Sequence, residues 1–152
     1  MGEILGMVIP VSYSWRGQFA NEALNSLHAE AFERLNFNDD WWAQVNRHSL
    51  GWVCANLDGG LVGFVNVAWD GGVHAFILDT IVAPQSQRHG VGTEMLSIAV
   101  REARKAGCEW LHVDFEDHLR HFGRVLIDQR VRVGGPLDRK PMTDQRLQLQ
   151  TR

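Results

Sequence analysis

A short glycine-bearing loop is the part of this chain whose residue types and spacing most directly suggest chemistry. It runs from Gln85 to Gly92, between an apolar stretch that ends at Val82-Ala83-Pro84 and a long amphipathic stretch. A loop that leads from a strand into a helix leaves the first backbone N–H groups of that helix without partners, at the positive end of the helix dipole. Gly90 and Gly92 have no Cβ atom, so an anion can approach the backbone closely. These features predict a cradle for a phosphate or a pyrophosphate, whereas the simpler interpretation is a tight helix start.

Two other phosphate-binding motifs do not fit this loop. A Walker loop ends in Gly-Lys-Ser/Thr, but Gly92 is followed by Thr93 and Glu94. A dinucleotide-binding fingerprint requires a third glycine where this chain has Met95, and it follows the first strand of a βαβ unit. Both motifs therefore fail on residues and on context.

Asp79 is a carboxylate inside the otherwise apolar segment 76–81. Burial raises the pKa of a carboxyl group because it disfavours the charged form, and a raised pKa suits a general base near neutral pH. Asp79 is therefore our first candidate for a catalytic base. The other interpretation is a carboxylate that bonds to the neighbouring backbone or to a histidine.

Histidines and acids are dense in a later segment, which contains His112, Asp114, Glu116, His118 and His121. Alternation along a strand places the first three on one side. We predict no metal site, because solvated or hydrogen-bonded side chains are the simpler account. Glu116 and His118 are instead candidates for acid or base catalysis.

The elements that must position these residues form an α/β arrangement. Apolar periodicity and turn residues give the order strand, two helices, three strands, helix, strand, helix, strand, which favours a mixed sheet. Both faces of the segment 61–69 are apolar, so this strand is expected to be central and covered on both sides. The predicted strands are 8–13, 52–57, 61–69, 73–82, 110–115 and 125–133, and the predicted helices are 20–31, around 41–45, 92–106 and 116–123.

Composition limits the class of protein. The chain has 152 residues, which suits one domain, and a net charge of −3, which gives no basic surface for nucleic acid. No window approaches the roughly 20 apolar residues of a membrane span, and the first residues do not read as a signal peptide. Cys54 and Cys108 lack metal-ligand spacing, so we expect reduced thiols in a cytoplasmic protein.

The loop and its setting resemble the acyl-CoA loop of the GCN5-related N-acetyltransferase (GNAT) superfamily. The pattern of that family is Gln/Arg-x-x-Gly-x-Gly/Ala at the start of the long central helix, and residues 87–92 satisfy it. The order of elements from Val8 to about Phe122 also follows the family. The resemblance implies a mixed, mostly antiparallel central sheet flanked by helices, in the order β-α-α-β-β-β-α-β-α-β. The domain would cover residues 1–133, and 134–152 would be an atypical C-terminal tail of the same domain.

The same resemblance implies a function and a set of site residues. Acetyl-CoA would be the cosubstrate of an N-acetyltransferase, and a primary amine of a small molecule or peptide would attack its thioester directly. Asp79 would act as the base, with Glu116 and His118 near the leaving thiolate. The loop would hold the pyrophosphate, and the pantetheine arm would enter a splay between the strands 73–82 and 110–115. The implied cofactor-binding residues are Thr80, Ile81, Val82, Gln87, Arg88, His89, Gly90, Val91, Gly92 and Thr93.

Several features depart from the family or leave alternatives open. The single tyrosine, Tyr13, is not on the helix after the fifth strand, where the family often has its general acid. Residues after Gly134 show no clear strand pattern, so we expect this end to pack irregularly or against a second copy of the chain. A degenerate member that binds acyl-CoA without turnover is the alternative function. Trp69, Asp70 and His74 are candidates to line an acceptor pocket, although Asp70 is favoured as a turn former.

Overall fold

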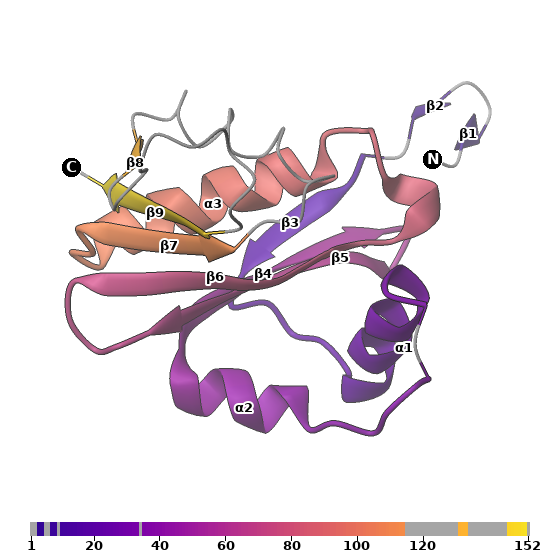
Figure 1. Cartoon of the computed structure of the whole chain (residues 1–152). Coiled ribbons are helices and arrows are strands. Elements are labelled where there is room, and N and C mark those ends of the chain that lie inside the picture. The colour runs from indigo at the N-terminus through magenta and orange to yellow at the C-terminus, as the bar shows by residue number, and fades with distance from the viewer. Residues whose placement is uncertain are drawn as a thin grey trace.

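The fold is known from a computed structural model, which describes residues 3–4, 7–8, 10–33, 35–114, 131–133 and 146–151. One sheet carries helix α3 on one face and helices α1 and α2 on the other (Figure 1). The described strands are β1 (Glu3–Ile4), β2 (Met7–Val8), β3 (Ser12–Trp15), β4 (Ser49–Leu57), β5 (Gly60–Trp69), β6 (His74–Val82), β7 (Trp110–Asp114), β8 (Val131–Val133) and β9 (Arg146–Thr151). The described helices are α1 (Asn21–Ala31), α2 (Trp41–His48), the 3-10 turn η1 (Pro84–Ser86) and α3 (Val91–Lys105).

The main sheet confirms the predicted fold class. Its strands follow the order β3-β4-β5-β6-β7-β9-β8, and β1 and β2 form a separate small pair. Each neighbouring pair is antiparallel except β6 and β7, which are parallel because α3 connects them. Strand β5 is buried on both faces from Val62 to Val67, as predicted from its apolar pattern.

Local sequence explains where two central elements turn and end. Asp58 and Gly59 both have positive φ, 50° and 77°, which is the type I′ geometry that joins β4 to β5 through two residues. At the C-terminal end of α3, Gly107 has a φ of 88°, and its N–H donates to Arg104 O at 3.0 Å. The N–H of Cys108 donates to Ala103 O at 3.0 Å, so both bonds of a Schellman motif are present.

Buried asparagine and capping residues fix α1 and α2 against each other. Asp40 begins α2, and its carboxylate accepts a hydrogen bond from Ala43 N at 3.1 Å. Asn25 is buried in α1, and its Oδ1 accepts from Trp41 Nε1 at 3.0 Å. Trp42 packs edge-on against Trp52 of β4, with ring centroids 5.6 Å apart. Both tryptophans of α2 therefore belong to the core under this helix pair.

Two sequence predictions about the ends of the chain were wrong. The first strand of the sheet is Ser12–Trp15 and not 8–13, because its residues pair with Val53–Asn56 of β4. The C-terminal segment does supply a strand, since β9 pairs with both β7 and β8. The polar residues of this segment gave no clear strand pattern in the sequence, and the strand forms through long-range pairing with β7 and β8. The predicted helix 116–123 and most of the predicted strand 125–133 lie outside the described residues.

No helix in the described part of the chain is long and apolar enough to cross a membrane.

Candidate active site

The predicted phosphate loop lies between β6 and α3 and is open at its helix end. Gly90 is the N-cap residue of α3, has a φ of 80° and provides no side-chain cap. The first intrahelical bond runs from Glu94 N to Gly90 O at 3.0 Å, so the N–H groups of residues 91–93 have no acceptor within the helix. A Cβ atom added at Gly90 would meet no atom within 4 Å. The backbone here is therefore accessible to an anion.

The loop is held from the side of the sheet. Ala83 N donates to Val62 O of β5 at 2.8 Å, and the side chain of Gln87 donates to Val82 O at 3.1 Å. Val91 is buried in the core, whereas residues 87–90 are exposed. Ser86 is 4% exposed, and its hydroxyl has no hydrogen-bond partner among the described residues. Gln87 thus braces the loop with its side chain, so a contact with the cofactor by that side chain stays a prediction.

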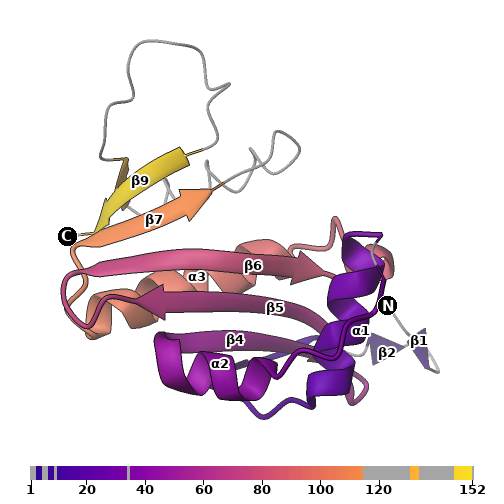
Figure 2. The same ribbon diagram turned by 60° about the horizontal axis from the view of Figure 1, so that its bottom comes forward.

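One edge of β6 is unpaired where the pantetheine arm is predicted. Strand β7 pairs with β6 only from His74 to Ile77, opposite residues 110–113. The described part of β7 ends one residue further on, at Asp114 (Figure 2). Within the described residues, the segment Thr80–Val82 therefore pairs with β5 on one side only. The splay implied by the family resemblance and the backbone bonds to a pantetheine arm both remain predictions.

Asp79 lies at a β-bulge on β6. Phe64 of β5 faces Ile81, while Asn66 faces Leu78, so β6 has one extra residue between these pairs. Asp79 has a φ of 52°, in the left-handed region that few residues other than glycine adopt. Bulges bend a strand and redirect a side chain, and they are frequent beside active sites. The bulge here lies just beyond the part of β6 that pairs with β7.

Asp79 has both features that were considered for it from the sequence: burial, which suits a base, and a hydrogen-bond partner. Burial raises the pKa of the Asp79 carboxyl group, while a hydrogen bond from Asn66 and the nearby charge of His28 oppose this increase. Asn66 is 2% exposed, and its Oδ1 accepts a hydrogen bond from Ser49 Oγ at 2.5 Å. The amide nitrogen of Asn66 is thereby directed to the carboxylate. The structure brings Ser49, Asn66 and Asp79 into one polar chain, in which Asn66 is buried and the other two are half-buried.

Asn66 is a site residue that the sequence analysis missed. A signal was present, since Asn66 interrupts the apolar run Val65–Val67 just as Asp79 interrupts its own strand. The pairing of β5 with β6 that joins the two residues is not evident from either strand alone.

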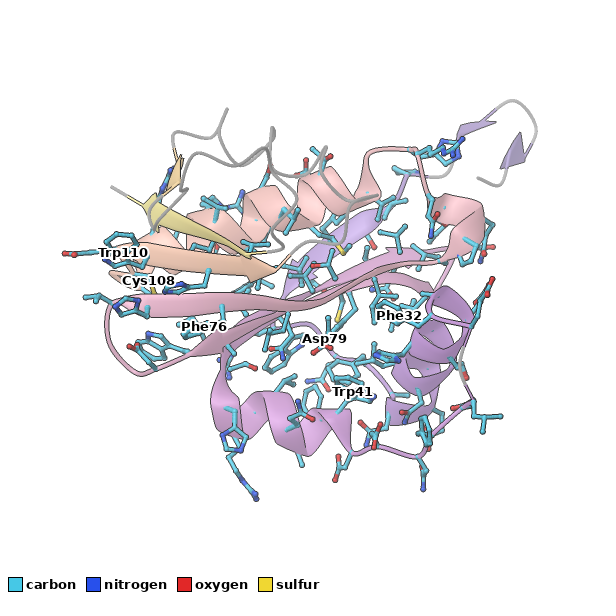
Figure 3. The ribbon with its side chains drawn as sticks, in the orientation of Figure 1. Phe32, Trp41, Phe76, Asp79, Cys108 and Trp110 are labelled. Carbon is cyan, nitrogen blue, oxygen red and sulfur yellow. The ribbon has the colours of Figure 1, made fainter. Side chains whose placement is uncertain are left out.

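Aromatic side chains surround Asp79 on the face of the sheet that carries α1 and α2 (Figure 3). His28 of α1 lies near the Asp79 carboxylate. The ring of His28 is 4.7 Å from that of Phe32 and 5.4 Å from that of Trp41, measured between centroids. The site therefore combines one carboxylate with apolar walls.

The predicted cluster around the second turn has a different role. The carboxylate of Asp70 accepts hydrogen bonds from Gly72 N at 2.7 Å and His74 N at 3.3 Å, so Asp70 shapes the turn as expected. Trp69 Nε1 donates to Gly72 O at 2.8 Å and braces the same turn. His74 hydrogen-bonds to His112 of β7, with 2.7 Å between Nδ1 and Nε2. Of these three residues, His74 also stacks with the rings of Trp110 and His112.

The remaining candidates are only partly placed. Glu116, His118 and His121 lie outside the described residues, so their predicted roles stay predictions. Among the residues that are described, no three His, Cys, Asp or Glu side chains form a group that could hold a metal ion. Both cysteines are buried thiols outside any disulfide, and burial raises the pKa of Cys54 to about 12, which makes its thiol a poor nucleophile.

The sequence of this chain matches a known protein family. A sequence model described as the acetyltransferase (GNAT) family matches residues 14–122. No curated protein sequence matches the chain.

Solved structures match over nearly the whole chain. An acetyltransferase of the GNAT family from Staphylococcus aureus has a TM-score of 0.67 at 12% identity, and the match covers 92% of this chain and 98% of that one. PaiA N-acetyltransferase from Thermoplasma acidophilum, solved with coenzyme A, has a TM-score of 0.66 at 15% identity, with 92% and 99% covered. The protein yncA from Salmonella typhimurium, solved with its cofactor acetyl-CoA, has a TM-score of 0.62 at 15% identity, with 91% and 92% covered. At these identities the matches establish the fold.

Proposed function

Because the chain belongs to the acetyltransferase (GNAT) family, we propose that it is an N-acetyltransferase that transfers an acetyl group from acetyl-CoA to a primary amine. Two of the similar structures were solved with acetyl-CoA or coenzyme A, which supports acetyl-CoA as the cosubstrate here. The observation that carries the proposal is the position of Asp79, a carboxylate on a bulge of β6 that contacts Asn66 of β5 and lies near His28 of α1.

Two features of the described residues suit two parts of acetyl-CoA. The open N-terminus of α3 at Gly90 suits the pyrophosphate, because its free N–H groups and dipole favour an anion. The edge of Thr80–Val82 that has no partner among the described residues suits the amide groups of the pantetheine arm, which require backbone partners. The two features are consecutive along the chain, so a ligand that occupies one can extend to the other.

Asp79 is the proposed general base. A thioester supplies an activated acetyl carbon, but an amine attacks it only after losing its extra proton. The raised pKa of Asp79 makes this carboxylate a stronger proton acceptor than an exposed aspartate. Glu116 and His118 remain our candidates for delivering a proton to the departing thiolate.

The proposed acceptor is a small molecule or peptide amine, and nucleic acid is not an expected partner. We propose a cytoplasmic location, because both cysteines are thiols and not disulfides. A homodimer formed through the C-terminal residues remains a proposal that sedimentation can test.

The proposal is tested by Asp79→Asn with Asp58→Asn as its matched control. Both aspartates have a left-handed backbone, with φ of 52° and 50°, but Asp58 lies in the exposed β4–β5 turn. We expect Asp79→Asn to lower turnover by roughly 10²- to 10⁴-fold without loss of acetyl-CoA binding. The Asp58→Asn variant should resemble the parent. Equal turnover in the parent and in Asp79→Asn would reject Asp79 as the base.

A parent protein that binds acetyl-CoA but acetylates no amine would favour the alternative function. In that case the chain would be a degenerate family member that binds acyl-CoA without turnover.

A further inference from the structure

A row of half-buried and exposed rings runs across β6 and β7, and it ends three residues from Asp79 at Phe76. The ring of Trp110 stacks near His74 at 6.1 Å, His74 near His112 at 5.0 Å, and His112 near Phe76 at 4.7 Å, between centroids. The planes of neighbouring rings differ by 11°, 23° and 16°, so the four rings are almost parallel. We call Trp110, His74, His112 and Phe76 the ring row. It crosses from β6 to β7 on adjacent strands.

The ring row lies on the same face as the Asp79 site. Residues paired across neighbouring strands point to the same side of a sheet. Phe76 is paired with Ala68, and Leu78 is paired with Asn66, which contacts Asp79. Asn66 is also paired with Trp52, which packs under α2, so this is the face that carries α1 and α2.

The helices leave this part of the face uncovered. Helix α2 packs on β4 and β5, and α1 on β5 and β6. Phe76 remains 38% exposed and Leu78 41% exposed, although both lie in the middle of a strand. On the other side of Asp79, Phe32 is 40% exposed (Figure 3). Exposed apolar side chains that gather around a buried polar group are typical of a binding surface.

The charges of this part of the chain restrict what the surface can bind. From residue 17 to residue 87 the sequence has two arginines, Arg34 and Arg47, and no lysine, against eight aspartates and glutamates. An acceptor with its own carboxylate or phosphate would meet repulsion, whereas a cation is attracted. Aromatic walls around a carboxylate suit an ammonium group that carries an apolar body.

We propose that the acceptor is an arylalkyl primary amine without an anionic group, which places its amine at Asp79 and its ring against Leu78 and Phe76. This inference rests on the proposed acetyl transfer. Leu78 and Phe76 lie one and three residues from Asp79, roughly 3 and 10 Å along the strand. An aromatic group joined to the amine by a short alkyl chain spans that interval.

The test is calorimetric titration of the protein saturated with coenzyme A, which cannot react. The probes are 2-phenylethylamine, phenylalanine and 1,4-diaminobutane. Phenylalanine has the same skeleton with an added carboxylate, and 1,4-diaminobutane keeps an amine but has no ring. We expect 2-phenylethylamine to bind at least about tenfold more tightly than either, since tenfold corresponds to about 1.4 kcal/mol.

Variants of the surface test where the ring lies. Phe76→Ser and Leu78→Ser should each weaken 2-phenylethylamine binding by about fivefold, because each removes apolar contact area. Val73→Ser is the control, since Val73 is 41% exposed but lies in the β5–β6 turn. Tighter binding of phenylalanine or 1,4-diaminobutane, or 2-phenylethylamine binding that neither Phe76→Ser nor Leu78→Ser changes, would overturn the inference.

The two proposals fail in different ways. If 2-phenylethylamine binds as expected but acetyl-CoA yields no acetylated product, the inference about the ligand stands and the proposed function fails. If 1,4-diaminobutane is acetylated and 2-phenylethylamine does not bind, the proposed function stands and the inference fails.

Discussion

The two halves of the candidate site are built in different ways. At the N-terminus of α3 the site consists of backbone, with Gly90 in a left-handed conformation and no side-chain cap. At the bulge of β6 it consists of side chains, since Asp79 depends on Asn66 and Ser49 from two other strands. A backbone site depends on a few consecutive residues, whereas a side-chain site depends on how distant strands pair. The first is therefore expected to tolerate most side-chain changes, and the second to be sensitive to single ones.

After Asp79→Asn, Asn66→Leu should have the largest effect on turnover among changes in the side-chain half. Removing the amide leaves the buried Asp79 carboxylate without a donor, which costs about 1–3 kcal/mol and raises its pKa further. We expect turnover near neutral pH to fall by about tenfold or more, and its rise with pH to shift to higher pH. Acetyl-CoA binding should stay unchanged.

Ser49→Ala sharpens the same test, because it removes only the bond that orients Asn66. Its effect on turnover should be smaller and in the same direction. A pH profile that neither variant moves would show that Asn66 does not position Asp79.

Asp79→Asn should raise stability near neutral pH while it removes activity. Burial raises the pKa of Asp79 in the folded protein, so the folded state binds its proton more tightly than the unfolded chain. The stability from this group is therefore complete below its unfolded pKa, about 3.9, and is lost as pH rises through the higher folded pKa.

The measurement is thermal unfolding of parent and Asp79→Asn over a series of pH values. The variant should have the higher Tm near pH 7, and the difference should shrink toward pH 3. Asparagine also tolerates the left-handed backbone at this position. A variant with the lower Tm near pH 7 would contradict the destabilising effect of the buried charge.

Ser86→Ala should have the smallest effect of these variants. Its free energy of unfolding, compared with that of Asn66→Ala, tests whether the loop half tolerates a side-chain change that the strand half does not. The Ser86 hydroxyl is buried and has no partner among the described residues, so its removal relieves a desolvated polar group. We expect the free energy of unfolding to stay the same or rise by up to about 1 kcal/mol. Asn66→Ala, which removes a bonded buried group, should lower it by about 1–3 kcal/mol. Urea unfolding of both variants gives the comparison, and a loss of more than about 1 kcal/mol in Ser86→Ala would refute it.

The same difference explains what the sequence could predict. The loop from Gln87 to Gly92 and the helix after it are local features, so their residues and order indicated the fold and the cofactor site. The helix cap at Asp40 and the turn at Asp58-Gly59 are local features of the same kind, because each depends on three or four consecutive residues.

Features that depend on strand pairing could not be predicted from the sequence in the same way. The bulge at Asp79 and its bond to Asn66 arise from the register between β5 and β6. Strand β9 has polar alternate positions and forms only because β7 and β8 lie on either side of it. The first strand was misplaced for the same reason, since its partner in β4 determines where it begins.

The central claim is that the N-terminus of α3 binds acetyl-CoA, and calorimetric titration of acetyl-CoA tests it most directly. The parent should be compared with Gly90→Trp and with Gly107→Trp. Both glycines have positive φ, 80° and 88°, and open space around the Cβ position, but they lie at opposite ends of α3. Saturable binding in the parent and in Gly107→Trp, lost in a folded Gly90→Trp, is the predicted result. No binding in the parent, or equal binding in Gly90→Trp, would contradict the account.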